Sequence, residues 1–176
     1  DTIYFGGPNG LTYFEPKNVS LNESIPSVVI TDFLLFNKSV IAMAEMGIRD
    51  SREKGQFSLT NTIEFTEEIK LNHSDYIFSF KFSALNFRQA KRTQFEYKLK
   101  GLDDNWIQTD SSNRRATYTN LSPGTYQFML RASNDDGFWG NNVKSIKVIV
   151  IPPFWLTTWF ISLAILIFVG LVYALH

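Results

Sequence analysis

Cysteine is absent from the 176 residues, and histidine is almost absent, with only His73 and His176. The lack of cysteine excludes disulfides and thiolate chemistry. It leaves the redox compartment undecided, because a chain of this length can bury a core without covalent cross-links. With no cysteine and no second histidine nearby, His73 is predicted to be a loop residue rather than a metal ligand or general base.

A net charge is also lacking, since 17 lysines and arginines balance 17 aspartates and glutamates. The basic residues form only short pairs, such as Lys91-Arg92 and Arg114-Arg115. Binding to a nucleic-acid backbone requires a concentrated basic surface. Nucleic acid is therefore excluded as a partner, and these pairs are interpreted as solvated loop charges.

Motifs for catalysis, cofactors and metals are missing as well. No serine lies in a nucleophile elbow, and no glycine-rich loop has the pattern of a phosphate cradle. Glu67 and Glu68 are adjacent, so on a strand they would point to opposite faces. The segments 103–105 (Asp-Asp-Asn) and 134–137 (Asn-Asp-Asp-Gly) offer oxygen ligands, but they lack the spacing of a calcium loop and are predicted turns. The sequence predicts no catalytic residue, no cofactor and no metal site.

What the chain does contain is an alternating apolar pattern, clearest after the turn at Pro123 and Gly124. Between 126 and 133, one face carries Tyr, Phe, Leu and Ala, and the other carries Gln, Met, Arg and Ser. A period of two indicates a half-buried strand. A tyrosine directly after such a turn, Tyr126, is typical of a tyrosine corner, in which the hydroxyl bonds back to nearby backbone.

Similar patterns recur along the chain at the spacing of a β-sandwich. The predicted strands cover residues 28–36, 62–71 with a kink near 67–68, 77–87, 95–99, 116–120, 125–134 and 144–151. The fold class is therefore mainly β, an immunoglobulin or fibronectin III-like antiparallel sandwich over residues 28–151. Residues 42–56 carry both charge signs and two glycines, and they are predicted to form an exposed loop.

The N-terminal residues 1–16 contain two short apolar runs around Gly-Gly-Pro-Asn-Gly, which predicts a β-hairpin. We identify no partner sheet for it in the chain, and an isolated hairpin is marginal in water. We expect it to belong to an upstream domain, joined to the sandwich by a linker over 17–27. The start at Asp1, without methionine or signal peptide, indicates a piece of a longer protein.

The C-terminal residues 152–176 change in character. About 22 residues from 154 carry no charge, which is enough for a helix to cross a hydrocarbon core of about 30 Å. The sequence predicts a transmembrane α-helix with interfacial anchors at Trp155, Trp159 and Tyr173. A buried core helix is the alternative, although the segment lacks a polar face. Pro152 and Pro153 separate the last strand from this helix and are predicted to form a stiff joint.

Five stretches of the chain together resemble a known family. They are 78–87 (FSFKFSALNF), 95–106 (FEYKLKGLDDNW), 116–126 (ATYTNLSPGTY), 132–139 (ASNDDGFW) and 152–159 (PPFWLTTW). In this order they closely resemble the three-tyrosine, or Y_Y_Y, domain of bacterial sensor proteins. The resemblance places the family's signature residues at Tyr97, Trp106, Tyr118, Pro123, Gly124, Tyr126, Gly137 and Trp139. The hairpin at 4–11 resembles the end of the last repeat of a β-propeller.

The resemblance implies a periplasmic signal-relay domain of a receptor in the bacterial inner membrane. The propeller upstream would bind the ligand, an oligosaccharide being one candidate, and the sandwich would pass the change through the membrane. The output would be a histidine kinase or a diguanylate cyclase, and neither lies in this chain. The implied partners are the propeller of the same chain, a second copy in a homodimer, and membrane lipid.

A second hypothesis is a membrane-tethered sandwich that binds carbohydrate through exposed aromatic residues. Trp106, Trp139 and the three tyrosines are the candidate platforms for it. Their predicted positions, on inward faces or at strand ends, favour core and corner roles instead. A hydrolytic enzyme is a third hypothesis without support in the sequence.

Overall fold

The computed structural model describes residues 2–8, 10–18, 24–40, 59, 61–85, 92–134 and 136–175. The loop predicted over 42–56 lies outside these residues, as does the end of the strand predicted over 77–87.

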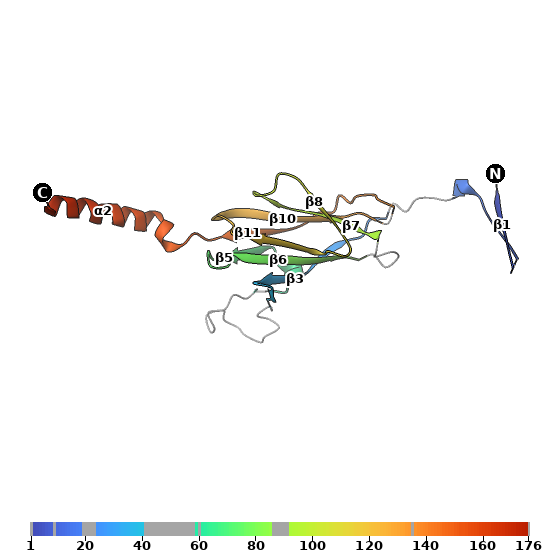
Figure 1. Cartoon of the computed structure of the whole chain (residues 1–176), viewed down its shortest axis with the longest axis horizontal. Coiled ribbons are helices and arrows are strands. Elements are labelled where there is room, and N and C mark those ends of the chain that lie inside the picture. Colours follow the sequence, from blue (N-terminus) through green and yellow to red (C-terminus); the bar gives the residue numbers. More distant parts are fainter. Residues whose placement is uncertain are drawn as a thin grey trace.

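Two β-sheets pack face to face and form a sandwich (Figure 1). One sheet has the strand order β5-β11-β10-β7-β8 and the other has the order β4-β3-β6-β9. The bounds are β3 Val28–Leu35, β4 Lys38–Ser39, β5 Glu68–Leu71, β6 Ile77–Ala84, β7 Gln94–Lys100, β8 Ile107–Asp110, β9 Arg115–Thr119, β10 Gly124–Ala132 and β11 Lys144–Val150. The predicted mainly β class is confirmed.

The core follows from the alternation of the central strands. In β6, Phe78, Phe80 and Phe82 are at most 2% exposed, and in β10, Phe128 is fully buried. The rings of Phe80 and Phe128 stack across the two sheets, with centroids 4.2 Å apart and planes 17° from parallel. Burial of large aromatic side chains is the main stabilising contribution expected in such a sandwich.

One strand pair departs from the antiparallel pattern. β11 pairs with β10 in antiparallel register and with β5 in parallel register, with Val148 opposite Ile69 and Val150 opposite Leu71. The other pairings within the described sheets are antiparallel. Because β5 and β11 run in the same direction, both end at the same edge of the sandwich.

The predicted hairpin is present as β1 (Ile3–Gly7) and β2 (Gly10–Phe14), paired with each other in a separate two-stranded sheet. All ten residues of the two strands are exposed. A short 3-10 helix, η1 (Pro16–Asn18), follows. In Figure 1 the hairpin lies beyond one end of the sandwich, and helix α2 extends from the opposite end.

Two regions differ from the strand prediction. Residues 62–71 divide into the 3-10 helix η3 (Ile63–Phe65) and strand β5, so only the second half of this region is extended. Thr66 explains the break, because its hydroxyl donates to the carbonyl oxygens of Asn61 and Thr62, which closes a turn. Strands β4 and β8 are additional. Both are short, with no buried residue, so they lack the alternating apolar signal.

The C-terminal segment also requires a correction. Residues Phe154–Leu156 form the 3-10 helix η5, and α2 runs over Thr158–Leu175. Within the residues that the structure describes, no helix combines the length and the apolar character needed to cross a membrane. The transmembrane helix predicted over 152–176 is therefore not confirmed.

Candidate functional site

The three signature tyrosines lie on the inner faces of three strands. Tyr118 in β9 is 6% exposed and belongs to the core. Tyr97 in β7 and Tyr126 in β10 are partly buried and pack against that core. The ring of Tyr118 contacts Phe78 and Phe128, with centroids 5.8 Å and 6.3 Å away, so it packs against residues of both sheets.

Asp103, in the turn after β7, connects the side chain of Tyr118 to the backbone of β7. Its Oδ2 accepts hydrogen bonds from the amide of Leu99 at 2.7 Å and from the hydroxyl of Tyr118 at 3.1 Å. The amide of Asp103 donates to the carbonyl oxygen of Leu99 at 2.9 Å. Leu99 belongs to one sheet and Tyr118 to the other. One carboxylate thus joins both sheets at the end of the sandwich.

Burial and the charge of Asp103 keep the hydroxyls of Tyr97 and Tyr118 protonated. Burial, and then the negative charge of Asp103, raises the pKa of the Tyr118 hydroxyl far above its ordinary value of 10.0. The same two causes raise the pKa of Tyr97. Because a phenolate here would be desolvated and would face a carboxylate, both hydroxyls stay neutral and Tyr118 remains a hydrogen-bond donor.

Tyr126 forms a corner at the turn before β10. Its hydroxyl donates to the carbonyl oxygen of Ser122 at 2.9 Å, four residues earlier, on the other side of Pro123 and Gly124. Gly101 packs on the ring of Tyr126. A Cβ on Gly101 would lie 3.0 Å from Cδ1 of that ring, and its backbone has φ +102°, a conformation open chiefly to glycine.

The signature tryptophans lie at strand ends, outside the core, and hold an arginine between them. Arg131 alternates in β10 with buried Leu130 and Ala132, so its side chain lies on the outer face of the five-stranded sheet. Its guanidinium carbon is 4.6 Å from the ring centroid of Trp106 and 5.5 Å from that of Trp139. The cation therefore lies over both rings, in the geometry of a cation–π contact.

Two further charges surround this arrangement. Glu96 lies opposite Arg131 in the sheet register. Its Oε2 pairs with Nη2 of Arg131 at 2.6 Å and accepts a hydrogen bond from Nε at 2.8 Å. The ammonium of Lys98 lies 5.3 Å from the ring centroid of Trp106. The aromatic pair is thus engaged within the protein, which favours the structural role over the carbohydrate platform.

Gly137 lies in the turn between β10 and Trp139, at φ +85°. The side-chain oxygen of Asn134 accepts hydrogen bonds from the backbone amides of Asp136 and Phe138, at 3.1 Å and 2.9 Å. Asp135 lies outside the described residues. The oxygen of Asn134 that was considered for calcium is thus used to form the turn.

The predicted joint is tied to the sandwich by contacts beyond the prolines. The amide of Ile151 donates to the carbonyl oxygen of Leu71, the last residue of β5, at 2.8 Å. Pro152 is exposed, whereas Pro153 is buried. Trp155 then packs edge-on against His73 of the β5–β6 turn, with ring centroids 5.1 Å apart at 79°. His73 is a loop residue, as predicted.

The three predicted membrane anchors are all exposed. Trp155 in η5 is 46% exposed, Trp159 in the first turn of α2 is 61% exposed, and Tyr173 near its end is 86% exposed. Their role as anchors stays a prediction.

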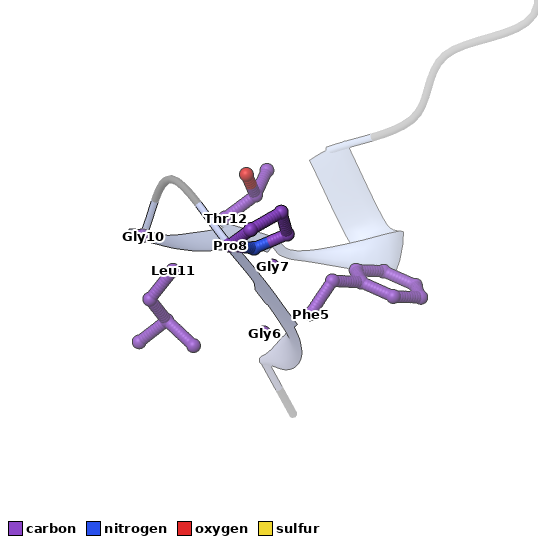
Figure 2. Close-up of a pocket in the computed structure, with 7 residues that line it drawn as sticks. All are labelled: Phe5, Gly6, Gly7, Pro8, Gly10, Leu11 and Thr12. Atoms are coloured by element: carbon purple, nitrogen blue, oxygen red, sulfur yellow. The ribbon is translucent and has the colours of Figure 1, made fainter.

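The hairpin carries a shallow hollow of about 260 Å³ (Figure 2). It is lined by Phe5, Gly6, Gly7, Pro8, Gly10, Leu11 and Thr12. Figure 2 shows the side chains of Phe5 and Leu11 on different sides of the hairpin, with no charged group among the lining residues. Binding pockets bring several polar groups together on a ligand, and this hollow does not.

Sequence reasoning missed three residues of this region: Asp103, Arg131 and His73. Asp103 was interpreted as a turn residue, since its partner Tyr118 is 15 positions away and in the other sheet. The sequence did contain a signal for Arg131, because the alternation over residues 126–133 predicts that its side chain lies on the outer face of the strand. Nothing local indicates the contact between His73 and Trp155.

Comparison with known proteins gives a family match for part of this chain. Residues 86–150 match the Y_Y_Y domain. Histidine kinase P4 of Formosa agariphila is 34% identical over 159 residues, which cover 90% of this chain and 11% of that protein. The chain thus spans about a tenth of the length of this curated relative.

Solved structures are similar to most of this chain. The extracellular domain of the hybrid two component system BT3049 from B. thetaiotaomicron is 28% identical, with a TM-score of 0.60, over 86% of this chain and 19% of that one. The extracellular domain of the hybrid two component system BT4673 from the same organism is 27% identical, with a TM-score of 0.59, over 89% and 19%. Residues 86–150 of this chain are thus similar to the Y_Y_Y domain, as the sequence resemblance predicts.

Proposed function

We propose that this chain is the periplasmic relay domain of a membrane-bound two-component sensor. It would receive a change from a ligand-binding β-propeller upstream and pass it toward a cytoplasmic histidine kinase. The chain itself would carry no catalytic step. The similarity to a histidine kinase and to extracellular domains of hybrid two component systems supports this assignment.

The observation that carries the proposal is the linear arrangement of the chain. The hairpin lies beyond one end of the sandwich, and α2 extends from the other (Figure 1). A domain that lies between an input and an output must connect them through a stiff body, and the aromatic core provides one. Two discrete arrangements of such a body, biased by ligand, would constitute the signal.

The exposed side chains of the hairpin are an argument for a propeller upstream of it. Ile3, Phe5 and Phe14 are exposed, and so are Tyr4 and Tyr13, whose rings contact each other at 6.0 Å. An isolated two-stranded hairpin is marginal in water. We propose that neighbouring propeller strands cover its apolar surface, and that the ligand, for which an oligosaccharide is a candidate, binds on the propeller.

A second copy of the protein is the partner we propose for helix α2. Its segment Thr158–Leu175 contains no charged residue, and Leu166 and Phe168 are about 70% exposed. The 176 residues contain no cysteine, so a single cysteine introduced along α2 is the only one in this part of the receptor. In the full-length receptor, we expect the efficiency of disulfide cross-linking to peak at every third or fourth position along α2. Cross-linking without a helical period would contradict a dimer at this helix.

Insertion of a flexible linker at the joint tests the relay. Six Gly and Ser residues placed after Ile151 would absorb movement of the sandwich before it reaches α2. We expect the full-length receptor to lose its response, measured as reporter transcription in cells given a panel of soluble polysaccharides.

The matched control is the same six-residue insertion between Asn141 and Asn142, which are exposed in the loop before β11. This insertion should leave the response intact. A normal response with the linker after Ile151 would contradict the relay function.

A further inference from the structure

The aromatic side chains after β11 form a continuous series that begins on the sandwich itself. His73 contacts Trp155, Trp155 contacts Phe154, Phe154 contacts Phe160, and Phe160 contacts Trp159. Centroid distances are 5.0–5.8 Å and interplanar angles are 79–89°, so each contact is edge-to-face. This is a preferred geometry for aromatic pairs. We call these five residues the exit aromatic chain.

The exit aromatic chain bypasses the proline joint. Its first member, His73, lies in the β5–β6 turn, which is part of the sandwich. Its last two members lie in the first turn of α2. Between them, η5 is closed by the amides of Leu156 and Thr157, which donate to the carbonyl oxygens of Pro153 and Phe154 at 3.0 Å and 3.1 Å. The helix is thus connected to the sandwich both through its backbone and through packed rings.

The parallel pairing of β5 with β11 makes this contact possible. Both strands end at the same edge, where Ile151 bonds to Leu71. His73 follows Leu71 by two positions, and Trp155 follows Ile151 by four. The β5–β6 turn therefore lies beside the chain that leaves the sandwich.

We propose that the exit aromatic chain fixes the direction of α2 relative to the sandwich, with His73 as the positioning residue that holds Trp155. The proline rings fix φ at both positions, but the Cα–C bond of Pro153 still rotates, which changes its ψ. Contact of Trp155 with His73 removes this remaining freedom. The signalling consequence of the contact rests on the proposed relay function, whereas the contact itself does not.

The direction of α2 can be measured directly in the 176-residue chain. Spin labels on cysteines introduced at Ser145, exposed in β11, and at Leu166, 70% exposed in α2, report the distance between sandwich and helix. The absence of native cysteine leaves these as the only labelled positions. We expect a narrow distance distribution for the parent chain and a broadened one for His73→Ala. Amide hydrogen exchange at Leu156 and Thr157 should accelerate about two- to tenfold, the range for loss of one edge-to-face contact.

Two variants make the result specific. His73→Phe keeps an aromatic ring at this position and should restore the narrow distribution. Tyr76→Ala is the matched control, because Tyr76 is in the same connection and makes an edge-to-face contact with Phe36 at 5.0 Å and 74°. It is not a member of the exit aromatic chain, so the distribution should remain narrow. Far-ultraviolet circular dichroism confirms that each variant is folded.

An unchanged distribution in His73→Ala, or equal broadening in Tyr76→Ala, would overturn the proposal. The relay function is tested separately by placing His73→Ala in the full-length receptor. If the distribution broadens and the reporter response is unaffected, the positioning role stands and the relay function fails. If both change, both stand.

Discussion

The link between Asp103 and Tyr118 leads to a quantitative prediction. Asp103→Ala removes an acceptor from the Leu99 amide and from the Tyr118 hydroxyl. Hydrogen bonds to charged groups contribute about 1.5–3 kcal/mol each. The bond to the Leu99 amide is short, at 2.7 Å, while the bond from Tyr118 is longer, at 3.1 Å, and belongs at the lower limit. We expect Asp103→Ala to lower the free energy of unfolding by about 3–4.5 kcal/mol.

Urea denaturation followed by tryptophan fluorescence measures this change. Tyr118→Phe removes only the hydroxyl, with an expected cost of about 1.5 kcal/mol. The double variant should cost about 1 kcal/mol less than the sum, because the bond can be lost only once. Asp104→Ala, at the exposed neighbouring position, should stay within about 0.5 kcal/mol of the parent. An additive double variant, or an Asp103→Ala cost equal to that of Asp104→Ala, would refute the reasoning.

Three further predictions concern the same region. The folded pKa of Tyr118 is raised above the unfolded value of about 10, so its contribution to stability is complete below pH 10 and is lost as the pH rises. The free energy of unfolding, measured by denaturation from pH 8 to 11, should therefore decline as the pH rises. Tyr118→Phe should reduce the slope of this decline by up to about 1.4 kcal/mol per pH unit, and equal slopes for the variant and the parent would contradict this. Gly101 and Gly137 both have a positive φ, but an added Cβ would lie 3.0 Å from a neighbouring atom at Gly101 and in open space at Gly137. Gly101→Ala should therefore lower the free energy of unfolding more than Gly137→Ala, by about 1 kcal/mol or more in thermal unfolding. Arg131→Lys should cost about 1–2 kcal/mol through loss of the guanidinium contact over Trp106, measured by urea denaturation, and a change below about 0.5 kcal/mol would count against a stabilising role of this contact.

Much of the fold was predictable because the strongest sequence signals come from burial on one face. Phe78, Phe80 and Phe82 in β6, and Phe128 and Leu130 in β10, repeat with period two, and all lie in the core. β8 has no buried residue, so its pairing with β7 depends on backbone bonds that leave no pattern in the sequence. The break at η3 depends on hydrogen bonds from one threonine, which no hydrophobic period reports.

The site was less predictable because its contacts join distant positions. The turn at Asp103 was predicted, but its hydrogen bond to Tyr118 depends on how the two sheets align. Likewise, His73 and Trp155 are 82 positions apart and meet because β5 and β11 are parallel. The start of the C-terminal helix was predicted too early, since η5 after Pro153 is apolar like the helix and composition does not separate them.

The parallel pairing of β5 with β11 also determines how the domain responds to tension. β3 enters the sandwich at the hairpin end, and β11 leaves it at the helix end. A pull between these ends acts along β11, which is bonded to β10 on one side and to β5 on the other. Its hydrogen bonds are then loaded in shear and must break together, instead of opening one at a time as in a peeled hairpin. Single-molecule stretching between residues 28 and 151 would measure this resistance, and a strand loaded in this way transmits force without lengthening.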